Sequence, residues 1–296
     1  MKRHSAELLL LLITVLWAGT FAVIKTEVTD VLPSVFVVLR FGVASIIGLA
    51  IWGKQLWGID AKTLMRGLVV GSLFGMGFLL QTMGLTSTTA STSAFITGTM
   101  VVFVPLVQRV VNGTSLRKDH AVSILLVLIG LALFTSPETG ALTIGDVLTL
   151  ASAILWAVYL TYIDRWTGER DSDPRKQNAL VLLQFLVTLA IATLAIGADA
   201  AAEKSLHVEV DTSLLIAVGY CGVFATVIPT FVQTRYQRFT HPVRAGVIFA
   251  LEPIAASVIA WMLISESFSA RQIVGAVVLM IAIVLPDIVF YRKNHD

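Results

Sequence analysis

The chain has few charged residues, a single cysteine and no long basic run. Asp, Glu, Lys and Arg make up 14% of its 296 residues, against about 25% in an average soluble domain. Because Cys221 is the only cysteine, an intramolecular disulfide is excluded. The net charge of +2 is too small to indicate a nucleic acid as partner.

Motifs for nucleotide hydrolysis and for metal-dependent catalysis are missing as well. The sequence has no G-x-x-x-x-G-K-[ST] loop, so it does not hydrolyse ATP through a P-loop. It has neither H-E-x-x-H nor a paired-cysteine motif. The five histidines, at positions 4, 120, 207, 241 and 295, all fall in predicted loops or tails. The sequence therefore predicts no metal site, no cofactor and no enzymatic activity.

Long apolar runs take up most of the chain. Hydrophobic residues make up 56% of it, in runs of about twenty residues that as helices are long enough to cross a hydrocarbon core of ~30 Å. Charges and turn residues divide the chain into ten predicted spans: 7–25, 32–53, 65–85, 94–111, 120–136, 146–164, 179–197, 212–234, 243–264 and 271–290. We expect an all-α protein embedded in the lipid bilayer, and the sequence gives no signal for an oligomeric state.

The positions of Lys and Arg orient these spans. Cytoplasmic loops of membrane proteins hold the excess of basic residues. With the N-terminus inside, seventeen of the 21 basic residues fall on the inner side and three on the outer side, and Arg40 lies within the second span. Both termini are therefore expected in the cytoplasm.

Two similar stretches lie near the start of the two halves of the chain. Residues 13–25 read ITVLWAGTFAVIK, and residues 152–164 read SAILWAVYLTYID. If the halves are 1–140 and 141–296, each holds five spans, and an odd number of crossings inverts the second half relative to the first. Inverted repeats are typical of transporters that bind substrate near the midplane of the membrane. Trp17 and Trp156 both fall near mid-bilayer, where they either line a common cavity or pack in the core.

Five segments then carry a family resemblance: WAGTFAVIK (17–25), LRFGVA (39–44), AFITGTMVVFVPLV (94–107), GDVLTLASAILWAVY (145–159) and LEPIAASVIAWMLISESFSARQIVGAVVLMIAIVL (251–285). In order and over both halves, they resemble the EamA-type branch of the drug/metabolite transporter superfamily, and within it the YddG-like exporters of amino acids. The resemblance implies ten helices in two inverted five-helix repeats and export of small metabolites across the bacterial inner membrane.

The repeat is not perfectly symmetric. Ala94 and Pro105 are eleven residues apart, whereas the corresponding Ala245 and Pro253 are eight apart. The two halves therefore differ here by almost one helical turn, and a symmetric cavity is not expected.

Two ionisable residues fall inside predicted spans. Glu252 lies near the bilayer centre, where an ionisable group is a functional candidate by default. It is a partner for a substrate amine, a proton carrier, or a structural carboxylate beside the backbone gap that Pro253 opens. Arg40 either extends toward the outer surface, pairs with an acid or faces a substrate carboxylate, and structural pairing is favoured.

Aromatic and hydroxyl side chains supply the other candidate substrate-binding residues. Helical spacing puts three of them on one face of the first span and two on one face of the sixth, and three phenylalanines from other spans are added. Lipid-facing or packed positions are the alternative for each phenylalanine. The candidates are Thr14, Trp17, Phe21, Phe78, Phe95, Trp156, Tyr159 and Phe249. A cavity lined by rings and hydroxyls suits amphipathic or aromatic solutes.

A glycine stripe on the third span has a different meaning. Gly67, Gly71 and Gly75 are spaced by four residues, and small residues at this spacing let two membrane helices approach closely. The stripe predicts helix packing and no binding site.

The expected function is that of a secondary transporter, with a small-molecule substrate and alternating access. Export of amino acids, aromatic ones among them, is the first interpretation. Export of drugs or quaternary amines is the alternative within the same class. A membrane-embedded enzyme or a non-transporting sensor is the alternative from a different class.

Overall fold

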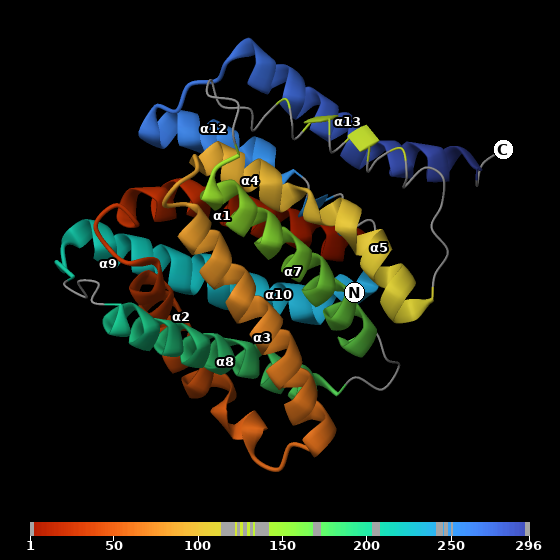
Figure 1. Cartoon of the computed structure of the whole chain (residues 1–296). Helices are drawn as coiled ribbons and strands as arrows, with labels where there is room; N and C mark the ends of the chain where they lie inside the picture. The colour runs from red at the N-terminus through yellow and green to blue at the C-terminus, as the bar shows by residue number, and fades with distance from the viewer. Residues whose placement is uncertain are drawn as a thin grey trace.

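The structure, a computed structural model, is helical in every described element (Figure 1). It describes residues 3–113, 142–167, 173–202, 208–240 and 251–293, with a few single helical positions between 122 and 133 and between 245 and 249. The helices of the first half are α1 (Arg3–Glu27), α2 (Pro33–Trp52), the 3-10 turn η1 (Gly53–Leu56), α3 (Ala61–Gly84), α4 (Ala90–Gly98) and α5 (Met100–Asn112). Those of the second half are α7 (Ile144–Thr167), α8 (Pro174–Ala201), α9 (Thr212–Gly219), the π-helix η2 (Tyr220–Val227), α10 (Ile228–Tyr236), the 3-10 turn η3 (Gln237–Phe239), α12 (Glu252–Ile264) and α13 (Ala270–Lys293).

Seven helical stretches in the described part of the chain are long and apolar enough to cross a membrane. They correspond to predicted spans one to four and six to eight, which confirms a multi-pass, all-helical membrane protein. Two shorter apolar helices, Glu252–Ile264 and Ala270–Ala282, fall within predicted spans nine and ten. The predicted fifth span, 120–136, lies outside the described residues apart from single positions. The total of ten spans therefore remains a prediction.

Polar side chains mark the starts of several helices. In each case a side-chain oxygen accepts a hydrogen bond from a backbone N–H in the first turn, which satisfies a donor that has no partner within the helix. The capping residues are Asp60 before α3, Thr89 before α4, Asp173 before α8 and Asp211 before α9. Three of these helices begin four or five residues before the predicted spans 65–85, 94–111 and 179–197, because the capped first turns extend into the polar residues between the apolar runs.

Two of the spans are not regular α-helices throughout. The span Ala90–Asn112 is broken at Thr99, which separates α4 from α5 and donates its hydroxyl to the Ile96 carbonyl oxygen at 2.6 Å. The span Thr212–Phe239 contains the π-helix η2, followed by Pro229 at the start of α10. Such departures in membrane helices are often found at functional sites.

The glycine stripe brings α3 against α8, as predicted. A Cβ on Gly71 would lie 2.8 Å from Cβ of Val187, and one on Gly75 would lie 3.0 Å from Cα of Thr188. A Cβ on Gly67 would clash with Leu183. Both separations are shorter than a normal carbon–carbon contact, so the two helices approach as closely as only glycine allows. Helix α3 packs extensively on α8 and α7, and α8 also packs on α2 (Figure 1).

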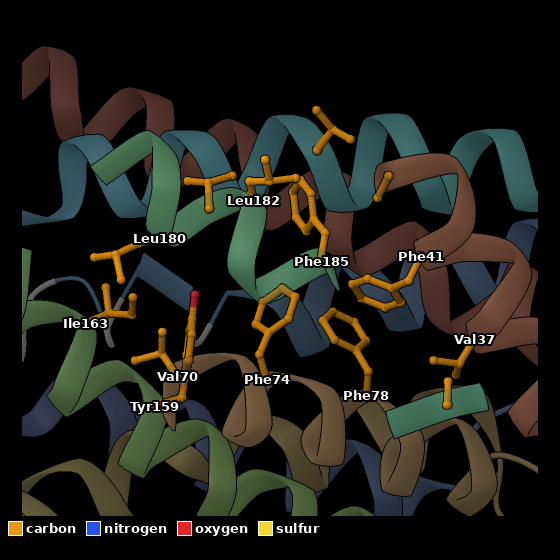
Figure 2. Close-up of a cluster of buried hydrophobic side chains, with 14 of the residues drawn as sticks. Val37, Phe41, Val70, Phe74, Phe78, Tyr159, Ile163, Leu180, Leu182 and Phe185 are labelled. Atoms are coloured by element: carbon orange, nitrogen blue, oxygen red, sulfur yellow. The ribbon is translucent and has the colours of Figure 1, made fainter. Parts of the chain in front are cut away.

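A large cluster of buried hydrophobic side chains lies among these helices. Figure 2 shows the rings of Phe41, Phe74, Phe78 and Phe185 gathered between α2, α3 and α8, with Tyr159 of α7 beside them. Phe41 meets Phe74 and Phe78 edge-on, with ring centroids 5.8 and 5.2 Å apart. Edge-to-face pairs of this kind stabilise a packed core beyond the area they bury. Phe78 and Tyr159 of this cluster also form part of the wall of the cavity described next.

Candidate functional site

A cavity lies where α1, α3, α7 and the helices around Phe249 and Glu252 meet. Its lining residues come from both halves of the chain: Trp17, Thr20, Phe78, Gln81, Thr97, Met100, Trp156, Tyr159, Leu160, Gln233, Phe249 and Glu252. The cavity has a volume of about 50 Å³. The cavity is narrow in this conformation, and a solute of more than a few atoms would require the helices to separate.

Six of the ten candidate residues line this one cavity. They are Trp17, Phe78, Trp156, Tyr159, Phe249 and Glu252. Trp17 and Phe249 meet with ring centroids 5.4 Å apart. Trp156 meets Phe78 at 4.8 Å. The two tryptophans of the repeated stretch therefore reach the same cavity, each through its own group of rings.

Two predicted members of the first-span face do not line the cavity. Thr14 is buried, and its hydroxyl donates to the carbonyl oxygen of Leu10 at 2.7 Å, within its own helix. Phe21 is buried in a separate apolar cluster with Ala18 and Ile24. On α1 the cavity is lined instead by Trp17 and Thr20, three residues apart.

Phe95 also lies away from this cavity. It is buried against Val102 and Ala282, and it borders a separate apolar hollow that Trp261 and Phe268 also line. The helical face of Phe95 is therefore turned toward α12 and α13.

Glu252 is the one charged residue among the described residues that line the cavity. Glu252 is 6% exposed. Its carboxylate has no hydrogen-bond or ion-pair partner among the described residues. Removing a carboxylate from water without a partner is costly. The site is therefore poised for a cationic group of a ligand or for a proton.

Four polar residues of the lining were missed from the sequence: Thr20, Gln81, Thr97 and Gln233. Gln81 donates from Nε2 to the hydroxyl of Thr97 at 3.0 Å, and Gln233 donates from Nε2 to Oε1 of Gln237 at 3.1 Å. All four lie inside apolar spans, and that position was the available signal, because a polar side chain in a membrane helix normally faces the protein interior. They add hydrogen-bonding groups to a lining that is otherwise mostly aromatic.

Arg40 lies beside the cavity and does not line it. Its side chain is 1% exposed, so it does not extend to the membrane surface. Among the described residues, no acid pairs with Arg40, and its hydrogen-bond partners are a hydroxyl and a backbone carbonyl. Its Nε donates to the hydroxyl of Thr226 at 2.7 Å, and Nη2 donates to the carbonyl oxygen of Ala225 at 3.1 Å. Its guanidinium carbon lies 4.3 Å from the centroid of the Phe78 ring, which does line the cavity.

Comparison with known proteins agrees with this architecture. The sequence matches the EamA-like transporter family over residues 4–136 and again over residues 143–286. An uncharacterized transporter of Archaeoglobus fulgidus is 29% identical over 284 residues, covering 96% of this chain and 86% of that protein. A second uncharacterized transporter of the same organism is 26% identical, covering 99% of each chain. A protein of known crystal structure has the same fold, with a TM-score of 0.72 at 16% identity and 99% of each chain covered.

Proposed function

Because the chain belongs to the EamA-like transporter family, we propose that it is a secondary exporter of small organic metabolites that carry an amino group, amino acids above all. The observation that carries this proposal is Glu252, a buried carboxylate without a partner among the described residues, in a cavity lined by five aromatic side chains. A carboxylate binds an ammonium group, and aromatic rings add apolar contact and cation–π attraction. The direction proposed is out of the cytoplasm, across the cytoplasmic membrane.

Contacts between helices support two inverted five-helix repeats, divided at residues 140 and 141. The proposed counterparts are α1 and α7, α2 and α8, α3 and the span Thr212–Phe239, and the span Ala90–Asn112 and α12. Helix α1 packs on α12, as α7 packs on α4 and α5. Helix α2 packs on η2, as α8 packs on α3. Each contact therefore has a counterpart when the halves are exchanged, as expected for a duplicated transporter.

Polar contacts between the two halves at both ends of the molecule support alternating access. Thr88 donates its hydroxyl to Asp146 Oδ1 at 2.6 Å, and the Ser91 N–H donates to Glu266 Oε2 at 3.4 Å. At the predicted cytoplasmic end, Thr240 donates its hydroxyl to Glu7 Oε1 at 3.3 Å. Rocking of one half against the other would break one set of contacts at a time, and the narrow cavity fits a conformation in which both sets are made.

The orientation has its own test. Reporter fusions at positions 60, 115, 170 and 240 should read as cytoplasmic, and those at 140 and 205 as external. One reversed position in this series would contradict the inverted repeat.

The substrate is tested by counterflow in liposomes that contain only the purified protein. The vesicles are preloaded with one unlabelled amino acid, and uptake of the same radiolabelled amino acid is followed for a panel of aromatic, aliphatic and small polar types. We expect exchange to be fastest for large amino acids, because their side chains contact the rings. Trp57→Ala is the matched control, because that side chain is 79% exposed and distant in sequence from the lining residues.

Export of drugs or quaternary amines is a second candidate, favoured by one observation. No Lys, Arg or His is among the lining residues that the structure describes, so the lining offers no cation to the carboxylate of an amino acid. Choline and tetraphenylphosphonium therefore belong in the same panel. Exchange of these cations without exchange of any amino acid would replace the first proposal by the second. Absence of flux for every compound would contradict both.

A further inference from the structure

A backbone carbonyl in the eighth predicted span accepts hydrogen bonds from two other helices. Ala225 lies in the π-helix η2, where each backbone carbonyl pairs with the N–H five residues later. Two side chains also donate to the Ala225 carbonyl oxygen: Nε1 of Trp17 from α1 at 3.1 Å and Nη2 of Arg40 from α2 at 3.1 Å. This carbonyl therefore connects three spans.

The surroundings of Arg40 are neutral throughout. Besides the Ala225 carbonyl, it contacts the hydroxyl of Thr226, which in turn donates to the Cys221 carbonyl oxygen at 2.7 Å. Its guanidinium lies over Phe78 at 4.3 Å and near Phe41 at 5.6 Å. Its Nη1 is buried with no hydrogen-bond partner. A charge held by a carbonyl, a hydroxyl and ring faces, with no acid among the described residues, is an expensive way to join helices, so a structural role alone is a weak reason for it.

Two contacts of Arg40 lead to residues of the cavity lining, one through the Ala225 carbonyl and one directly to the Phe78 ring. The shared Ala225 carbonyl connects it to Trp17, and the ring face of Phe78 connects it to Trp156, whose ring centroid lies 4.8 Å from that of Phe78. Figure 2 shows Phe41 and Phe78 side by side in this region. Loss of the guanidinium would release one donor from Ala225 and uncover one face of Phe78.

We infer that Arg40 is a positioning residue of the transport cavity, which holds Trp17 and Phe78 in the orientations that shape the substrate site. The inference rests on the proposed function only in calling the cavity a transport cavity. Its geometric content is that one buried side chain fixes two separate aromatic groups of the lining, one through the shared Ala225 carbonyl and one through a cation–π contact.

The test uses fluorine NMR of the full-length protein labelled with 5-fluorotryptophan, in nanodiscs and without any substrate. The chain has six tryptophans, and single Trp→Phe substitutions assign their signals. In Arg40→Met we expect the signals of Trp17 and Trp156 to move by more than their linewidths, while the signal of the exposed Trp57 stays in place. Arg40→Lys keeps the charge but lacks the planar fork, so its shifts should be smaller and in the same direction.

A matched control and a second variant keep the test decisive. Arg66→Met removes the guanidinium 5.5 Å from the Trp166 ring and should move the Trp166 signal alone. If Arg40→Met does not fold, Arg40→Lys and Thr226→Val, which removes the acceptor of Nε, take its place.

The inference is overturned if the Trp17 and Trp156 signals stay in place in folded Arg40 variants. It is equally overturned if all six signals move together, since that result means a general structural role. Neither outcome bears on the proposed substrate, because no substrate is present. Conversely, absence of amino acid or amine flux would contradict the proposed function and leave these shifts as expected.

Discussion

The two tryptophans of the repeated stretch should respond differently to replacement by phenylalanine. The Trp17 N–H donates to the Ala225 carbonyl oxygen at 3.1 Å, whereas the Trp156 N–H is buried without a partner among the described residues. Trp17→Phe removes a hydrogen bond with a net value of about 0.5–1.5 kcal/mol, and Arg40 still satisfies the carbonyl. Trp156→Phe removes an unpaired buried N–H whose desolvation costs about 1–3 kcal/mol.

The loss of ring contact works in the opposite direction. Trp156 meets the rings of Phe74, Phe78 and Tyr159, and each such pair contributes about 0.5–1.5 kcal/mol. Because phenylalanine keeps one six-membered ring, most of these contacts persist. On balance, Trp17→Phe should lower the free energy of unfolding by about 1–2 kcal/mol more than Trp156→Phe does.

The assay is thermal unfolding of the purified variants in detergent without substrate. A difference of 1–2 kcal/mol corresponds to a few degrees in Tm for a chain of this size, and Trp57→Phe should leave Tm unchanged because that side chain is exposed. Equal destabilisation by the two substitutions, or greater destabilisation by Trp156→Phe, would refute the reasoning. Ring packing would then outweigh hydrogen bonding at both positions.

Three further predictions follow from other parts of the structure. If a proton binds at the buried Glu252 during the cycle, Glu252→Gln should abolish flux driven by a pH gradient in proteoliposomes, and wild-type flux in that variant would make Glu252 structural. Gly71→Leu should lower Tm and membrane yield, because its side chain would enter Val187 of α8, whereas Gly42→Ala, with open space at its Cβ, should be tolerated. Two hydrogen bonds, one from the Lys176 ammonium and one from the Thr63 N–H, hold the pKa of Asp60 below its usual value. The stability from that contact is therefore present above the unfolded pKa of ~3.9 and is lost as pH falls toward the lower folded value. Asp60→Asn should flatten acid unfolding curves, and identical curves would contradict this.

The helical spans could be predicted because the bilayer imposes them on the sequence. A run must be apolar for about twenty residues, and the residues between runs must end one helix and cap the next. Span two, predicted at 32–53, is observed at Pro33–Trp52. The break at Thr99 and the π-helix at Tyr220–Val227 were not predicted, because both depend on hydrogen bonds that apolar periodicity does not encode.

The cavity could be predicted in part, because aromatic residues near mid-bilayer are visible in the sequence. Helical spacing gives the angle between two residues on one helix but not the direction in which their face points. It therefore grouped Thr14 and Phe21 with Trp17, although only Trp17 reaches the cavity. Gln81 and Gln233 were the better signals, since amide side chains inside apolar runs must find polar surroundings.

Ala225 illustrates the harder case, in which the functional group is a backbone carbonyl. Nothing about an alanine in an apolar run indicates a hydrogen-bond acceptor, yet its oxygen receives both Trp17 and Arg40. Pro229 does not mark this carbonyl, because in the π-helix η2 the backbone partner of residue 225 is the N–H five residues later. A carbonyl oxygen has two lone pairs and can accept a further hydrogen bond, and buried Trp and Arg side chains are well suited to donate it. Apolar periodicity shows neither the π-helix nor the direction in which this oxygen points, so the contact becomes visible only in the structure.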